Sequence, residues 1–98
     1  MRLARVTGTV VATRKDEKLD GLRFLLVEDV ELDMSGTGRF VVAADSVGAG
    51  VGEVVLYASG SSARLTHQTD GKPCDATIMA IVDLIDSSDG TRLFKKED

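Results

Sequence analysis

The sequence is poor in cysteine, proline and aromatic residues. Its 98 residues include one cysteine, one proline, one tyrosine, three phenylalanines and no tryptophan. A single cysteine excludes an intrachain disulfide, which fits a reducing cytosol. One cysteine and one histidine also fall short of the roughly four ligands that a structural zinc site needs. We therefore expect a fold that is stabilised by neither disulfides nor metal.

The chain also lacks long hydrophobic runs and an excess of positive charge. No apolar stretch approaches the roughly 18 residues of a transmembrane helix. The 16 acidic residues outnumber the 12 basic ones, for a net charge of −4 and an isoelectric point near 4.9. This balance argues against binding to a phosphate backbone or to an anionic membrane surface. The amino end is basic, but three threonines interrupt the residues after it, so we predict no signal peptide.

The length fits one domain spanning residues 1–98. Short β-branched segments separated by turn residues predict strands, and no segment has sustained helical periodicity. The expected strands are 3–13, 22–32, 40–44, 53–58 and 77–86, with a further strand at 91–95 after a turn at 87–90. A single helical turn is expected at 61–64, and loops at 33–38 and 45–52. Strand number and spacing predict an all-β fold: a small five-stranded barrel of the oligonucleotide-binding (OB) type, with a short helical turn.

No segment carries a convincing catalytic or cofactor-binding pattern. Gly48–Gly52 departs from the dinucleotide fingerprint at Glu53 and leads into a strand instead of a helix. Gly60–Arg64 resembles a nucleophile elbow, but Arg64 stands where the second glycine is needed. His67 is a lone histidine in a polar loop. The acidic residues at the strand ends, which are Glu28, Asp29, Glu31, Asp33, Asp83 and Asp86, are interpreted as solvated edge protection. We predict no enzyme activity, cofactor or metal.

Several predicted strands are apolar on both faces. The even positions from Ala4 to Ala12 form one apolar face of the first strand, and Phe24–Val27 and Phe40–Ala44 are apolar throughout. In the last strand Ile78, Ala80, Val82 and Leu84 are expected on one face, and Met79, Ile81 and Ile85 on the other. A small barrel without helices cannot cover its own outer faces. We therefore predict a homo-oligomer that buries them, since exposed apolar patches usually mark interfaces. Ordinary apolar surface residues, which are common on soluble proteins, are the alternative.

Three segments in the same order together resemble one known family. They are residues 2–13, residues 43–53 with the sequence AADSVGAGVGE, and residues 60–64 with the sequence GSSAR, followed by Asp75-Ala76 and by Ala80–Asp83. The chain is similar to the EutN/CcmL family of bacterial microcompartment vertex proteins. The resemblance implies OB-like barrels in a cyclic homopentamer that caps the vertices of a polyhedral shell in the cytoplasm. It also implies hexameric shell proteins as partners, and no catalysis, nucleic acid or membrane.

The two glycine-containing blocks provide the candidate subunit-interface residues. They are Gly48, Ala49, Gly50, Gly52, Ser61, Ser62 and Arg64. The planar guanidinium of Arg64 suits a bidentate acceptor on a neighbouring subunit, and closure of its own turn is the alternative. Residues 15–20 and 65–73 are interpreted as variable loops, and no role is assigned to Cys74.

An OB-fold module for single-stranded nucleic acid is the alternative function. Such a module needs a basic groove with stacking aromatic side chains. Arg23-Phe24 and Arg39-Phe40 are the available pairs, and strand alternation sends the members of each pair to opposite faces. A serine hydrolase using His67 is a third reading, which a preorganised triad would have to support.

Overall fold

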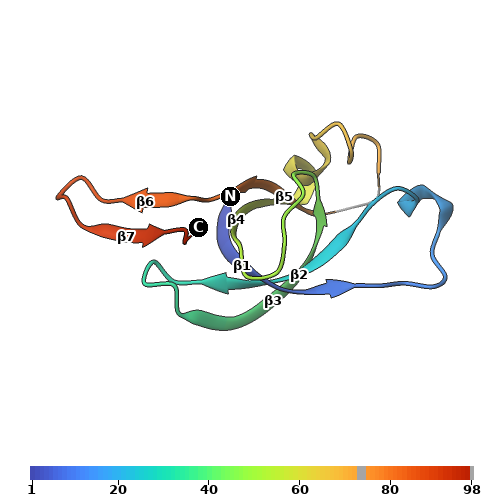
Figure 1. The fold of residues 1–98 in the computed structure, drawn as a ribbon. Coiled ribbons are helices and arrows are strands. Elements are labelled where there is room, and N and C mark those ends of the chain that lie inside the picture. Colours follow the sequence, from blue (N-terminus) through green and yellow to red (C-terminus); the bar gives the residue numbers. More distant parts are fainter. Residues whose placement is uncertain (73–74, 98) are drawn as a thin grey trace.

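Five strands close into a barrel in the computed structural model, which describes residues 1–72 and 75–97 (Figure 1). The strands are β1 (Arg2–Val10), β2 (Phe24–Val30), β3 (Gly36–Asp45), β4 (Val54–Ser59) and β5 (Ala76–Ile81). Their order around the barrel is β1-β2-β3-β5-β4, and the β3–β5 pair is parallel, whereas the other pairs are antiparallel. The predicted all-β five-stranded barrel is thereby confirmed.

Two short 3-10 helices lie in the connections. η1 (Glu17–Leu19) interrupts the β1–β2 connection, where a charged turn was expected. η2 (Gly60–Arg64) follows β4 and confirms the predicted helical turn, which begins one residue earlier than expected. Pro73 and Cys74, in the segment between η2 and β5, lie outside the described residues.

The barrel core is built from small and medium aliphatic side chains. On β2 the alternation is regular, with Leu25 and Val27 fully buried and with Phe24 and Leu26 on the outer side. Ala4, Val6, Ala43, Val55, Ala76 and Ile78 complete the interior with Tyr57, which is the single tyrosine of the chain. Small residues suit this interior because a five-stranded barrel encloses little space.

Two bulges correct the predicted strand faces. Val6 pairs with Val27, but Gly8 pairs with Leu26, so Thr7 is an extra residue and Val10 lies on the outer side with Phe24. The even positions of the first strand therefore do not share one face. A second bulge at Met79 brings Ile81 to the core side with Ile78, opposite to the prediction. A bulge inserts one residue, and one residue reverses the alternation beyond it.

The last predicted strand, 77–86, is in fact two strands that belong to different sheets. β5 ends at Ile81, and β6 (Leu84–Asp86) pairs with β7 (Arg92–Lys95) in a separate two-stranded sheet. The turn at 87–90 is confirmed, because the Ser87 N–H donates to the Thr91 carbonyl oxygen over 2.8 Å. β3 is longer than predicted and begins inside the expected loop 33–38. Figure 1 shows β6 and β7 projecting from one side of the barrel as an arm.

Candidate subunit-interface surfaces

The connection between β3 and β4, which we call the glycine loop (residues 46–53), is held by side chains of its own subunit. The carboxylate oxygen Oδ1 of Asp45 accepts hydrogen bonds from the N–H groups of residues 47, 48 and 49 over 3.1–3.2 Å. Arg23 Nη1 donates to Asp45 Oδ2 over 3.0 Å and to the Ala49 carbonyl over 3.1 Å. Glu53 Oε1 accepts from the Gly50 N–H over 2.7 Å. These hydrogen bonds therefore fix the conformation of the loop within its own subunit.

This loop presents backbone and two valines to the surface. Val51 is 64% exposed and Val47 is 39% exposed, although both are aliphatic. Gly52 has a φ of +93°, which side-chain-bearing residues rarely adopt, so a glycine is required there. Gly48 and Gly52 are exposed and Gly50 is half-buried. Ala49 differs from the other candidates, because its side chain is 1% exposed and belongs to the core of its own subunit.

η2 covers part of the outer side of β4 and β5. Ala63 is fully buried there, and the hydroxyl of Thr77 donates to the Ala63 carbonyl oxygen over 2.6 Å. Ser61, Ser62 and Arg64 are exposed on the other side of the same turn. Arg64 also has an interaction within the chain. The candidates of this block thus lie on the surface, on a turn whose position is fixed by packing.

A third surface is the apolar outer face of β1, β2 and β3. It consists of Val10, Phe24, Leu26, Phe40 and Val42. The register places these side chains together, because Val10 is opposite Phe24 and Leu26 is opposite Val42. Phe40 is 54% exposed and Val42 is 49% exposed, whereas Phe24 and Leu26 are half-buried. This face contains none of the seven candidate residues; the apolar runs in the sequence were the signal for it.

A buried polar cluster that sequence reasoning missed lies at one end of the barrel. Asp29 was expected to be solvated edge protection, but it is 7% exposed and points into the barrel. Its Oδ1 accepts a hydrogen bond from the Tyr57 hydroxyl over 2.5 Å. Its Oδ2 lies 3.4 Å from Arg39 Nε and 3.9 Å from Arg2 Nη1. The register of β2 is the signal, since Asp29 follows Leu25 and Val27 at spacing two.

The environment of Tyr57 raises the pKa of its phenol to about 12. Burial is the largest cause, because it disfavours the charged phenolate. The hydrogen bond to Asp29 and the negative charge of that carboxylate add to it, and the two arginines partly offset it. The phenol therefore stays protonated at neutral pH and donates to Asp29. Asp29 and Tyr57 thus form a buried hydrogen-bonded pair inside the barrel.

The described side chains do not form a recognisable metal, catalytic or nucleic-acid site. Among residues 1–72 and 75–97, no group of three or more His, Cys, Asp or Glu side chains is placed to hold a metal ion. His67 is exposed in the loop after η2. Arg23 and Arg39, expected as parts of the nucleic-acid alternative, are paired with Asp45 and Asp29. Over the same residues, no helix is long and apolar enough to cross a membrane.

A closed barrel with an uncovered apolar face and a preorganised loop is the architecture of a subunit that can assemble with copies of itself. The chain belongs to the EutN/CcmL family: the model described as "Ethanolamine utilisation protein EutN/carboxysome" matches residues 1–83. The chain is 48% identical over 89 residues to the bacterial microcompartment shell vertex protein PduN of Salmonella typhimurium. The alignment covers 87% of this chain and 98% of that protein.

Solved structures agree with the family assignment. CcmL from Nostoc superposes with a TM-score of 0.93 at 41% identity, over 98% of this chain and 100% of that chain. The GrpN pentameric microcompartment shell protein from Rhodospirillum rubrum gives 0.79 at 39% identity, over 89% of this chain and 98% of that chain. The predicted family, pentameric class, shell location and non-enzymatic role are confirmed: the chain is a shell vertex protein of a bacterial microcompartment.

Proposed function

We propose that the apolar outer face of each subunit packs against the loop side of the next subunit in a homopentameric ring. The loop side comprises the glycine loop and η2. A cyclic ring needs two different surfaces on every subunit, because its contacts are heterologous. The subunit presents two such surfaces, one on the strands β1, β2 and β3 and one on the segments that follow β3 and β4, and this supports the pairing.

The exposed aromatic and aliphatic side chains of the outer face carry this proposal. Phe40 and Val42 are about half exposed on a regular strand pair, with Phe24 and Leu26 beside them. Complete burial of one large apolar side chain contributes roughly 1.5–3 kcal/mol relative to full exposure. Several half-exposed side chains on each of five subunits therefore provide a substantial driving force for ring closure.

On the loop side, close backbone approach and two exposed valines are the contact elements. Gly48, Gly50 and Gly52 let a neighbouring strand face come near the backbone, and Val47 and Val51 add apolar area. Ser61, Ser62 and Arg64 are exposed on η2 and offer hydrogen-bonding groups. Ala49 is left out as a contact side chain because it is buried in its own subunit.

The ring is proposed to act as a cap between hexameric shell proteins, with residues 1–98 as one vertex domain in the cytoplasm. We propose no nucleic-acid, membrane or cofactor partner. The pairing of Arg23 and Arg39 with buried carboxylates leaves less positive surface for a phosphate backbone, which disfavours the nucleic-acid alternative.

The decisive experiment is native mass spectrometry of the full chain and of Val42→Glu. The full chain is expected at five times the 10.4 kDa subunit mass, and Val42→Glu is expected to be monomeric at micromolar concentration. Leu32→Glu is the matched control, since Leu32 is also exposed but lies in the β2–β3 turn. A monomeric full chain, or a Val42→Glu ring as stable as the parent, would contradict the proposal. Co-expression with a hexameric shell protein then tests the shell contact.

A further inference from the structure

The arm formed by β6 and β7 is attached to the barrel but is not part of it. Within the part of the chain that the structure describes, β6 pairs with β7 and with no strand of the barrel. The arm and the β1–β2 connection project on opposite sides of the barrel, and the molecule has principal extents of 48 × 25 × 23 Å (Figure 1). A two-stranded sheet is marginally stable on its own in water. The arm therefore needs support from packing outside its own two strands.

The arm lies beyond the part of the chain that the family model matches. The family match ends at residue 83, directly before β6. The CcmL structure from Nostoc aligns over 98% of this chain, so the arm has a counterpart there. The apolar outer face, the glycine loop and η2 all lie before the first residue of β6. Closing the ring and the role of the arm are separable questions.

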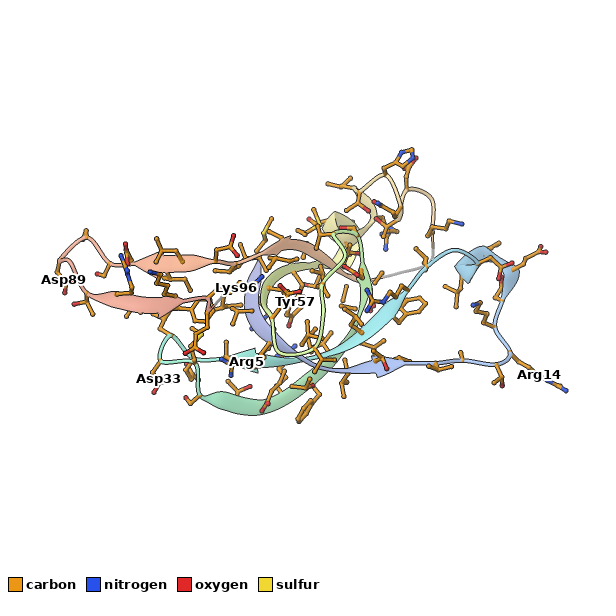
Figure 2. The ribbon with its side chains drawn as sticks, in the orientation of Figure 1. Arg5, Arg14, Asp33, Tyr57, Asp89 and Lys96 are labelled. Atoms are coloured by element: carbon orange, nitrogen blue, oxygen red, sulfur yellow. The ribbon has the colours of Figure 1, made fainter. Side chains whose placement is uncertain are left out.

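The root of the arm is fastened to the glycine loop. Lys96 Nζ donates to Glu53 Oε2 over 2.6 Å, and the other oxygen of Glu53 accepts from the Gly50 N–H (Figure 2 labels Lys96). The Val82 N–H donates to the Val54 carbonyl oxygen over 2.8 Å. The Glu53 carboxylate thus joins arm and loop, so the arm is continuous with the loop side proposed as a ring contact.

A hollow of about 450 Å³ lies between the arm and the barrel. Its apolar walls are Val51 and Val54 from the barrel side and Phe94 from the arm. Its polar lining includes the cations Arg5, Lys95 and Lys96 and the anions Glu53 and Glu97. The hollow thus combines apolar walls with a small excess of positive charge.

We propose that the arm is a clasp that overlaps the neighbouring subunit of the ring, with this hollow receiving Phe40 from the neighbour's apolar outer face. The inference rests on the ring proposed above. A second copy of the chain is the occupant because the hollow continues the loop side, which faces that outer face in the ring. Phe40 is its largest exposed side chain, and Glu28, opposite Phe40 on β2, brings a carboxylate toward the cationic rim.

The first test removes the arm by ending the chain after Asp83. The shortened chain is expected to fold and to form pentamers at micromolar concentration, since all five barrel strands and both proposed contact surfaces lie before residue 84. On dilution in native mass spectrometry, its rings are expected to dissociate at a concentration at least about tenfold higher than those of the full chain. An unchanged dissociation midpoint would overturn the clasp and leave the proposed ring intact.

The second test does not depend on the folding of a shortened chain. In a Cys74→Ser background, Phe40→Cys and Lys95→Cys are combined and treated with a short bismaleimide crosslinker. Multimers linked between subunits are expected on denaturing gels, whereas Phe40→Cys with Arg14→Cys is expected to give none, because Arg14 lies at the opposite end of the molecule (Figure 2). Intact rings without Phe40–Lys95 crosslinks would overturn the clasp; a chain without rings would overturn the proposed function itself.

Discussion

The barrel and the arm are both built largely from antiparallel strand pairs, but they obtain their stability differently. Each barrel strand has two neighbours, and the interior side chains of Leu25, Val27 and Ile78 are fully buried. Each arm strand has one neighbour, and Leu84 on β6 is 49% exposed. The barrel thus pairs all its strands and buries its core side chains within one chain. The arm would bury its side chains only against another surface, so its stability should depend on assembly.

The largest expected effect tests the self-sufficiency of the barrel. Ile78→Ala deletes fully buried atoms from β5 and is expected to lower the free energy of unfolding by about 2–5 kcal/mol. Leu84→Ala in the arm is the matched control, and we expect a loss below about 1 kcal/mol, because half of that side chain is already in water. Denaturant unfolding of both proteins in the same monomeric Val42→Glu background measures the difference.

Equal losses for the two variants would contradict this comparison. In the assembled ring the contrast is expected to narrow, since the clasp would bury part of Leu84 or its neighbours. Repeating the measurement with the parent ring therefore separates what the subunit stabilises by itself from what assembly adds.

Sequence patterns predicted the barrel well because period two and turn residues are local signals. They failed where one extra residue changed the register, at Thr7 and Met79. A bulge leaves little trace in composition, yet it turned Val10 outward and Ile81 inward. The break between β5 and β6 was missed for a related reason. Residues 77–86 are apolar except for Thr77, Asp83 and Asp86 and predict a single strand, although β5 pairs with β4 and β6 pairs with β7.

The surfaces were predicted less completely than the fold. The apolar runs around Phe24 and Phe40 correctly indicated an uncovered outer face, whereas Ala49 was grouped with the exposed glycines although it fills the core. Glycine loops report where backbone is tight, but a one-dimensional pattern does not show which side of the loop faces inward. The role of Asp29 was hidden because its partners Tyr57 and Arg39 are distant in sequence.

The next effect in size concerns the buried pair of Asp29 and Tyr57. The raised pKa of Tyr57 means that its contribution to stability is complete below pH 10, its ordinary value, and is lost as pH rises through about 12. The two-unit difference corresponds to at most about 2.7 kcal/mol. Tyr57 is the single tyrosine of a chain without tryptophan, so tyrosinate absorbance reports its titration directly.

Two variants sharpen this prediction. Asp29→Asn removes the negative charge and is expected to shift the absorbance midpoint below 12 but not down to 10, because burial, the largest cause, remains. Tyr57→Phe is expected to abolish the alkaline loss of stability assigned to this group. An absorbance midpoint near pH 10 in the folded parent protein would contradict the burial of the Tyr57 phenol. Tyr57 would then be as accessible to solvent as the side chains of the arm.

The smallest expected effect lies where barrel and arm are joined. Glu53→Gln removes the ion pair with Lys96, whose side chain is about two-fifths exposed, so solvent screening limits the loss to about 0.2–1 kcal/mol. The hydrogen bond from Lys96, followed by that from the Gly50 N–H, lowers the pKa of Glu53 below its usual 4.5. This contribution is therefore present above pH 4.5 and is lost as pH falls through the lowered pKa.

Hydrogen exchange of the arm amides measures this effect locally. At pH 7 we expect exchange in β6 and β7 to rise by up to about fivefold in Glu53→Gln, the factor that corresponds to 1 kcal/mol. Glu17→Gln in η1 is the matched control and should leave the arm unchanged, because Glu17 is exposed in the β1–β2 connection. If arm exchange were equally slow in parent and variant, the root would not be what holds the arm. Its order would then come from the neighbouring subunit alone, and dilution of the ring would release it.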